Sequence, residues 1–175
     1  CTGGSYVLYY NPNLSSLEIS LQEQVQPPYI TNVYDGVSET FDVNNYWYGL
    51  DQDVYTVSQS GNINYVSYNK SWRQEWSALV TDVSLNNGDF DRLSFSIMSS
   101  SPNYIVKVEG DGIYKEQWFA GNGLLQSFEL TFYEYSKEQI NKINRVLIFM
   151  DAGTSPASGN FEIHHVNFEK EKVDN

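Results

Sequence analysis

The chain of 175 residues has little cysteine, histidine or positive charge. Its single cysteine cannot form a disulfide within the chain, so disulfides do not stabilise the fold. Ten Lys and Arg stand against 22 Asp and Glu, which gives a formal net charge of -12. Nucleic acids and anionic membrane surfaces bind to positively charged patches. The composition therefore argues against both as partners.

Long hydrophobic runs are also missing. No stretch approaches the roughly 20 apolar residues that a membrane-spanning helix needs. Disorder is excluded for most of the chain, because aromatic residues make up 15% and charged residues only 18%. The length is that of one ordinary domain.

What the sequence does contain is Tyr, Asn and Ser. There are 14 Tyr, 17 Asn and 20 Ser. Such side chains form neutral hydrogen bonds, and the Tyr rings add flat apolar faces. This composition indicates a surface suited to neutral ligands rich in hydroxyl groups.

The N-terminal segment differs from the rest. The opening residues, Cys1 to Ser5, resemble the start of a mature bacterial lipoprotein, in which an acylated Cys precedes small residues. A lipid anchor at Cys1 is one expectation, and a fragment boundary at this point is the alternative. Pro27 and Pro28 favour extended backbone. We therefore assign residues 1–28 to a tether or linker and residues 29–175 to the folded domain.

After Tyr29 the pattern is typical of short strands separated by turns, such as the turn indicated by Asn86-Asn87-Gly88-Asp89. Leu93, Phe95 and Ile97 alternate with serines, which predicts a strand with one buried face. Strands are predicted at 54–58, 62–68, 76–84, 93–97, 104–109, 113–119, 124–133, 145–151 and 160–168. A Ser-x-x-Gln capping box at Ser136 predicts one short helical turn. The fold class is all-β, a two-sheet antiparallel β-sandwich.

Several segments carry a family resemblance over residues 34–168. They are Tyr34-Asp35-Gly36, Trp47, Asn62-Ile63-Asn64-Tyr65, Trp72, Trp76, Thr81-Asp82-Val83, Phe90 to Phe95, Val106 to Glu109, Ile143 to Phe149, Ser158 to Ile163 and Val166-Asn167-Phe168. Their order resembles the jelly-roll carbohydrate-binding modules with a galactose-binding-like fold, which are appended to bacterial polysaccharide-degrading enzymes. The resemblance implies a non-catalytic glycan-binding domain, extracellular or on a bacterial cell surface, with neighbouring domains in a larger protein.

Many modules of this kind hold a structural calcium ion with an acidic residue in the last strand. In this sequence that place falls on His164 or His165, and imidazoles are poor ligands for calcium. Asp35, Glu39 and Asp42 remain as weak calcium candidates, and no other cofactor is expected. The two histidines are adjacent, so regular strand geometry predicts that they point to opposite faces.

Candidate ligand-binding residues combine aromatic rings with polar groups, because a sugar offers a C–H face and hydroxyl edges. They are Tyr65, Tyr68, Trp72, Arg73, Lys107, Glu109, Trp118 and Asp151. Trp72 is the preferred stacking ring, whereas Trp47 and Trp76 are expected in the core. The alternatives are a plain surface ion pair for Lys107 with Glu109 and a turn-starting role for Asp151.

An enzyme is the least favoured class. The sequence has no Gly-x-Ser-x-Gly motif, and any triad or metal centre would depend on the two adjacent histidines. We therefore expect a domain that binds a neutral polysaccharide or oligosaccharide. The alternative is a structural or adhesive surface lipoprotein that binds another protein, and a stand-alone glycoside hydrolase ranks third.

Overall fold

A computed structural model describes residues 29–172 of the chain. The predicted tether over residues 1–28, with Cys1, lies outside the described residues. Within residues 29–172, no helix is both long and apolar enough to cross a membrane.

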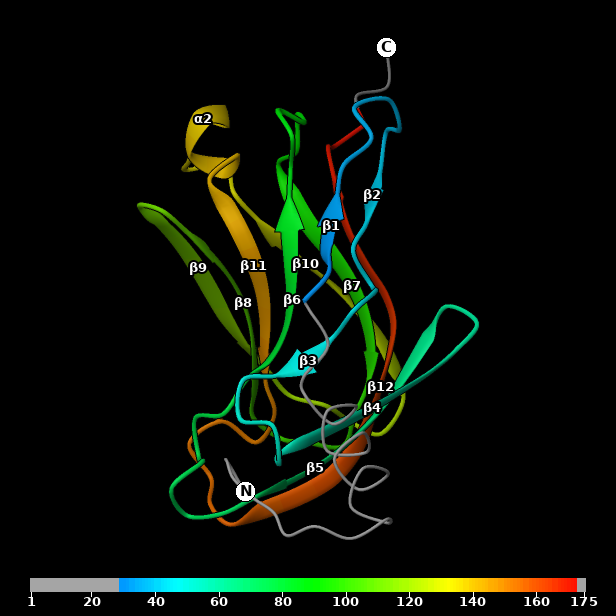
Figure 1. Ribbon diagram of the computed structural model, residues 1–175, viewed down its shortest axis with the longest axis vertical. Coiled ribbons are helices and arrows are strands. Elements are labelled where there is room, and N and C mark those ends of the chain that lie inside the picture. The colour runs from blue at the N-terminus through cyan, green and yellow to red at the C-terminus, as the bar shows by residue number, and fades with distance from the viewer. Residues whose placement is uncertain (1–28, 173–175) are drawn as a thin grey trace, which may run out of the picture.

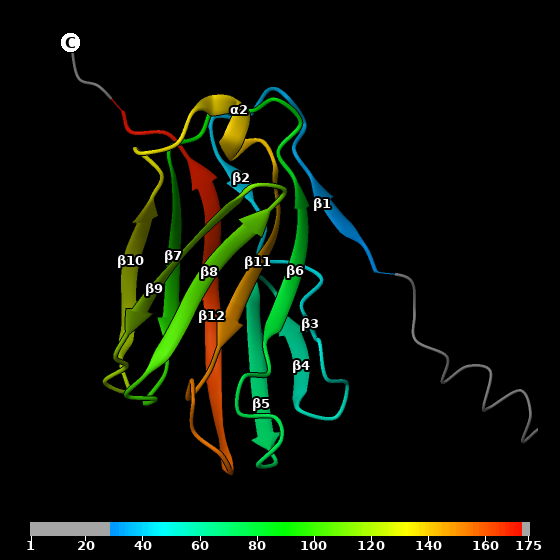
Figure 2. The same cartoon turned by 90° about the vertical axis from the view of Figure 1, so that its left-hand side faces the viewer.

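The described chain forms two six-stranded sheets that pack face to face (Figures 1 and 2). Sheet A contains β1 (Thr31–Val33), β3 (Tyr48–Gly49), β6 (Leu79–Ser84), β8 (Tyr104–Gly110), β9 (Ile113–Phe119) and β11 (Ile143–Phe149). Sheet B contains β2 (Phe41–Asp42), β4 (Tyr55–Ser60), β5 (Ile63–Lys70), β7 (Arg92–Met98), β10 (Leu125–Thr131) and β12 (Ala157–Glu169). The strand orders are β1-β6-β11-β8-β9, with β3 beside β6, and β10-β7-β12-β5-β4, with β2 beside β12. All pairs are antiparallel except β1 with β6.

The predicted alternation of buried and exposed residues is confirmed. In β7, Leu93, Phe95 and Ile97 are at most 1% exposed and face the core, whereas the intervening serines face outward. Side chains alternate in this way because successive residues of a strand point to opposite faces of the sheet. The fold class, an all-β sandwich, is therefore as the sequence predicted.

The predicted turns and the helix are also present. Asn86 and Asn87 have positive φ values of 47° and 62°, a conformation that Asn tolerates better than most residues. The helix α2 (Lys137–Ile140) begins at Ser136, whose side chain accepts a bond from the Gln139 backbone amide in a complete capping box.

Two local predictions are wrong. The strand predicted from residue 76 begins only at Leu79, because two turns precede it, closed by bonds from the Gln74 amide to Ser71 and from the Ser77 amide to Gln74. In β12, a register irregularity between Ile163 and His165 breaks the alternation.

The irregularity in β12 places both histidines on the outer face. His164 Nε2 lies 2.8 Å from Glu162 Oε1, and His165 contacts the Asn167 side chain. Glu162 and Asn167 pair with outward-facing residues of neighbouring strands. The prediction of opposite faces therefore fails at this bulge.

The core between the sheets is rich in aromatic rings. Phe95, Tyr104 and Phe119 form one cluster, with ring centroids 5.1 to 5.6 Å apart. Trp47 is buried as predicted, and its indole N–H donates to Asn44 at 2.9 Å. Such packing stabilises the scaffold that carries the two outer faces.

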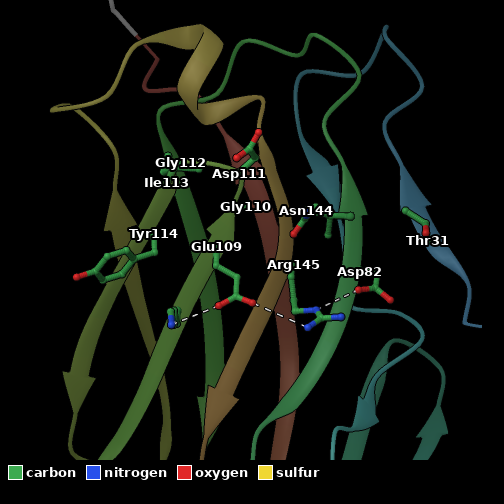
Figure 3. Close-up of a pocket in the computed structure, with 12 residues that line it drawn as sticks. Thr31, Asp82, Glu109, Gly110, Asp111, Gly112, Ile113, Tyr114, Asn144 and Arg145 are labelled. Carbon is green, nitrogen blue, oxygen red and sulfur yellow. Dashed lines mark hydrogen bonds and ion pairs between the residues drawn. The ribbon is translucent and has the colours of Figure 1, made fainter.

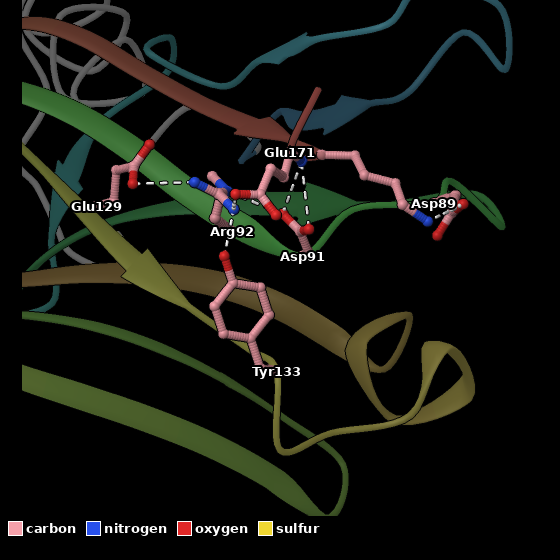
Figure 4. A network of polar contacts seen from close by, with 7 residues as sticks. Asp89, Asp91, Arg92, Glu129, Tyr133 and Glu171 are labelled. Atoms are coloured by element: carbon pink, nitrogen blue, oxygen red, sulfur yellow. Dashed lines mark hydrogen bonds and ion pairs between the residues drawn. The ribbon is translucent and has the colours of Figure 1, made fainter. Parts of the chain in front are cut away.

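Arg92 holds one edge of sheet B together (Figure 4). Its guanidinium bonds to Asp91 at 2.9 Å, to Glu129 at 3.0 Å and to the Tyr133 hydroxyl. The hydrogen bond and charge of Asp91, reinforced by Glu129, raise the pKa of Arg92 above its ordinary value although burial opposes this. The Glu171 amide also donates to Asp91, which fixes the end of the described chain beside β7.

Candidate functional site

The outer face of sheet A carries a row of polar side chains that crosses the strands (Figure 3). Strand register aligns one residue from each of five strands, namely Tyr114 (β9), Glu109 (β8), Arg145 (β11), Asp82 (β6) and Thr31 (β1). On each strand one chain neighbour of the row residue is buried, namely Ile113, Val108, Val146, Val83 and Asn32, so the row residue itself faces outward.

Charges of opposite sign alternate along this row. Arg145 Nε lies 3.4 Å from Asp82 Oδ1, and its Nη1 lies 3.9 Å from Glu109 Oε2. Glu109 Oε1 also meets Lys107 Nζ at 3.3 Å, so the predicted ion pair is present. The Tyr48 hydroxyl donates to Asp82 at 2.8 Å. The network orients each polar group while leaving part of it accessible to a ligand.

Tyr48 and Arg145 in this network have raised pKa values. Burial, the hydrogen bond to Asp82 and the charge of Asp82 raise the pKa of Tyr48 to about 12. For Arg145, burial lowers the pKa, but interactions with Tyr48, Asp82 and Glu109 outweigh it and raise the pKa overall. At neutral pH the guanidinium is charged and the phenol is protonated, so both are hydrogen-bond donors.

Aromatic rings border the polar row. Tyr114 lies at the β9 edge, 63% exposed, with the Lys107 ammonium 5.3 Å from its ring centroid. On the opposite side, Tyr29 stacks on Tyr48 with centroids 4.1 Å apart. Phe149 and Tyr48 pack over an outer apolar patch made of Ala78, Val80 and Leu147. The face thus combines donors and acceptors with flat apolar rings.

Two tryptophans complete the border at the far end of β9. Trp118 is 51% exposed and Trp76 is 54% exposed, and their rings meet edge to face with centroids 6.3 Å apart. The expectation that Trp76 is a core residue is therefore wrong. It lies on the loop before β6, where a Cβ atom on Gly153 would approach its ring to 3.3 Å.

A hollow of about 1020 Å³ lies over the polar row. Gly110, Asp111 and Gly112, at the β8–β9 turn, form one end of it (Figure 3). A Cβ atom at Gly110 would lie 1.8 Å from the Lys142 carbonyl oxygen, so only glycine fits there. The hollow is broad and open, and its volume is at the upper end of the range of small-molecule sites.

A buried lysine fixes the loop that carries Trp76. Lys70 is 2% exposed, and its Nζ donates to three backbone carbonyls, those of Glu75 at 3.1 Å, Met150 at 2.7 Å and Asp151 at 2.9 Å. Burial lowers the pKa of Lys70, although the charges of Asp151 and Glu75 oppose that shift. The ammonium ties the β5–β6 loop to the end of β11.

The predicted site residues fall into separate places. Lys107, Glu109 and Trp118 lie together on the outer face of sheet A. Tyr65 faces outward from sheet B, and Trp72 and Arg73 lie on the β5–β6 loop, with the guanidinium 4.7 Å from the indole centroid.

The remaining two predicted residues meet inside the molecule. Tyr68 is buried and donates to the Asp151 carboxylate, which also accepts from Ser101. Asp151 has a φ of 46°, so it occupies a turn position. The Asp151 carboxylate therefore joins β5, which carries Tyr68, to the segment after β7, which carries Ser101.

Of the polar row, sequence reasoning found only Glu109. Asp82, Arg145 and Tyr114 sit on three strands distant in sequence, and only the register brings them into line. For Asp82 and Arg145, the available signal was a charged residue in the outward phase of a strand that is otherwise strongly apolar.

Two of the three calcium candidates, Asp35 and Asp42, accept local hydrogen bonds. Asp35 accepts bonds from the Val37 and Ser38 amides and the Ser38 hydroxyl within its own turn, and these bonds hold its pKa below the ordinary value. Asp42 accepts from the Asn44 amide. Across residues 29–172 no group of three His, Cys, Asp or Glu residues is placed to hold a metal ion.

Comparison with known proteins shows the fold. No family model matches the sequence, and no curated protein matches it. A variant of a family 29 carbohydrate-binding module, solved with cellulohexaose, is similar with a TM-score of 0.54 and 11% identity over 74% of this chain and 89% of that chain. A family 6 carbohydrate-binding module is similar with a TM-score of 0.50 and 9% identity over 83% of this chain and all of that chain.

The likeness extends to a protein of another kind. The insecticidal crystal protein Cry2Aa is similar with a TM-score of 0.51 and 10% identity over 79% of this chain but only 22% of that chain. The chain therefore has the jelly-roll sandwich of carbohydrate-binding modules, and this sandwich also forms one part of a longer protein of different description.

Proposed function

We propose that this domain is a non-catalytic carbohydrate-binding module that binds a polysaccharide on the outer face of sheet A. The single observation that carries the proposal is the row of polar side chains from Tyr114 to Thr31, bordered by exposed aromatic rings. The fold of carbohydrate-binding modules supports it. One of these modules was solved with cellulohexaose, which makes β-linked glucan a suitable first probe.

The geometry matches the two kinds of surface that a sugar presents. Trp118 and Tyr114 lie four residues apart on the same face of β9, about 13 Å apart at the usual rise of a strand. Each ring can pack against the C–H face of a different sugar unit. Between and beside them, Arg145 and Glu109 supply donors and acceptors for hydroxyl groups.

The charges of the face favour a neutral ligand. Lys107 and Arg145 are both paired with carboxylates, and Glu116 adds a further negative charge on β9. A uronate or sulfate group would have to displace a carboxylate from its cation, which costs electrostatic energy. We therefore propose a neutral polysaccharide or oligosaccharide as the partner.

Catalysis is not part of the proposal. Asp82 and Glu109 are the two carboxylates of the row, and both are bound to the same Arg145 guanidinium. Glycoside hydrolysis needs two carboxyl groups that face each other across the scissile bond. Two carboxylates side by side on an open face do not have that arrangement.

The remaining parts of the proposal concern the place of the domain in its protein. We propose that it is extracellular or displayed on a bacterial cell surface, that Cys1 carries a lipid anchor and that further domains accompany it. Treatment of cells with a lipoprotein signal-peptidase inhibitor, followed by fractionation, tests the anchor. Binding of another protein in place of a glycan is the alternative, and the paired charges of the face make it less suited to a flat apolar interface.

Affinity electrophoresis and calorimetry test glycan binding. The folded chain is titrated with cellohexaose and run through gels that contain β-glucan, galactomannan, xylan or polygalacturonate. We expect retardation by at least one neutral polysaccharide and none by polygalacturonate. Absence of binding to every neutral polysaccharide in a broad panel would refute the proposal.

A further inference from the structure

We propose that sheet B carries a second sugar-binding groove, on the opposite side of the sandwich from the first site. It is centred on Tyr65, which the sequence singles out and which the site on sheet A does not use. The inference rests on the proposed function, because both sites would bind neutral glycan.

Strand register builds the groove in the same way as the first site. One row crosses four strands of sheet B, with Ser58 (β4), Tyr65 (β5), Glu162 (β12) and Met98 (β7) directly opposite one another. A hollow of about 560 Å³ lies over this row, and its lining also includes Thr56, Ser67, Ser99, Ser100, Gly123 and Asn160.

Residue size explains why a hollow exists on this face. Tyr65, Glu162 and Met98 are long, whereas the side chains between and beside them are mostly serine and threonine. Tyr65 is 42% exposed because its cross-strand neighbour Ser58 is too small to cover the ring. The outer face of β5 thus presents a ring face over a polar floor.

The carboxylate of the groove is held in place. His164 Nε2 lies 2.8 Å from Glu162 Oε1, and their side chains are only 24% and 31% exposed. The other oxygen, Oε2, has no hydrogen-bond partner within residues 29–172 and is available to accept from hydroxyl groups. Glu162 and His164 are two residues apart in β12 and both lie on its outer face. The register irregularity between Ile163 and His165 does not separate them.

The chemistry of the lining selects the ligand class. A phenol ring and the Met98 thioether offer apolar contact, and hydroxyl, amide and carboxylate groups offer hydrogen bonds. The lining has no Lys or Arg, so an anionic sugar would meet only the Glu162 carboxylate. A neutral sugar is the ligand that fits.

Two sites on opposite faces would act independently on short ligands and together on long ones. The two sheets pack about 10 Å apart, and each site points away from the other. A hexasaccharide bound to sheet A cannot reach sheet B, but a monomer with two sites can join two polysaccharide chains. Avidity on a polymer then exceeds the affinity of either site.

Calorimetry with a neutral hexasaccharide that the chain binds, cellohexaose first, tests the inference. We expect two sites per chain in the wild type, one site in Tyr65→Ala, one site in Trp118→Ala and none in the double variant. Tyr65→Phe keeps the ring and is expected to retain both sites. Glu162→Gln, nearly isosteric, is expected to weaken the sheet B site about tenfold and serves if Tyr65→Ala does not fold.

Polymer cross-linking and NMR give two further readouts. The wild type is expected to precipitate or thicken a soluble polysaccharide, whereas either single-site variant binds it without cross-linking. Titration should shift amide signals of β5 and β12 as well as those of β8 and β11. A single site per chain that Trp118→Ala removes, with β5 and β12 unperturbed, would overturn this inference and leave the proposed function standing. Loss of all binding in the wild type would overturn both.

Discussion

Trp76 and Trp118 meet edge to face at the border of the polar row, with ring planes at 84° and centroids 6.3 Å apart. Each ring is about half exposed, so the pair adds little to the core. Trp76 reaches this place because its loop is held by Lys70 and by contact with Gly153. The pair therefore borders the proposed binding face of sheet A.

Replacing either indole is expected to weaken glycan binding without unfolding the protein. Trp118→Ala and Trp76→Ala should each lower affinity for the bound polysaccharide about tenfold or more, because ring stacking is lost. Melting temperatures should stay within a few degrees of the wild type, since both rings are half exposed. Trp72→Ala is the matched comparison, because Trp72 is 68% exposed on the same loop. A larger loss of affinity in Trp72→Ala than in Trp118→Ala would show that the binding site lies on the β5–β6 loop.

Arg145→Met tests the centre of the polar row. The methionine keeps the length of the stem but removes the guanidinium that joins Asp82 and Glu109. We expect binding to fall at least tenfold, while stability changes by about 1 kcal/mol or less, because half-exposed ion pairs contribute little to folding. Arg73→Met removes a guanidinium from the loop and is the control. Unchanged binding in Arg145→Met would exclude the polar row as the site.

Lys70→Met is expected to be the most destabilising of these changes. It leaves three carbonyl oxygens, those of Glu75, Met150 and Asp151, without their donor in a buried place. The cost should be about 3 kcal/mol in denaturant unfolding. Affinity for glycan should also fall, because the loop that positions Trp76 loses its anchor. A variant as stable as the wild type would show that the ammonium does not hold the loop.

Alkaline pH is expected to destabilise the fold through the buried phenol of Tyr104 and the half-buried phenol of Tyr48. Burial raises the pKa of Tyr104 to about 12, and burial with the bond to Asp82 raises that of Tyr48 to about 12. An unfolded tyrosine titrates near 10. Both phenols therefore contribute stability that is fully present below pH 10 and is lost as pH rises toward 12. Denaturant midpoints measured from pH 8 to 11.5 should fall over the upper part of this range.

Tyr104→Phe isolates one of these phenols. The Tyr104 hydroxyl is fully buried and has no hydrogen-bond partner within residues 29–172. Its removal should leave stability at pH 7 unchanged or raise it by about 1 kcal/mol, since no bond is broken. The variant should also lose less stability than the wild type above pH 10. The lowered pKa of Lys70 makes stability rise with pH, which is opposite to the effect of the phenols. Because Lys70 is present in both the wild type and the variant, its effect cancels when the two are compared.

Calcium is expected to have no effect on stability. The Asp35 oxygens are engaged within their own turn, and Asp42 is bound to the Asn44 amide. Melting curves with EDTA and with millimolar calcium should coincide. Calcium at a free concentration a hundredfold above its Kd would add about 2.7 kcal/mol to the free energy of unfolding. A rise of several degrees in melting temperature with calcium would therefore reveal a calcium site formed by other oxygen ligands.

The sequence alone determined the fold class and the chemistry of the surface. Alternation in Leu93–Ile97, the Asn86-Asn87 turn and the capping box at Ser136 are local signals, and each is present in the structure. Local pattern is sufficient for them because strand phase and turn conformation depend on near neighbours. It also pointed to some residues of the proposed site, namely Lys107, Glu109 and Trp118.

Only the tertiary structure decided which of these residues share a face. Asp82, Glu109 and Arg145 become neighbours through the pairing of β6, β11 and β8, and no local signal encodes the register between strands far apart in sequence. The same pairing separates Tyr65 from Lys107, since it places them on different sheets. Trp76 was misassigned for a related reason, because an indole next to apolar residues has the pattern of a core position until a loop carries it outward.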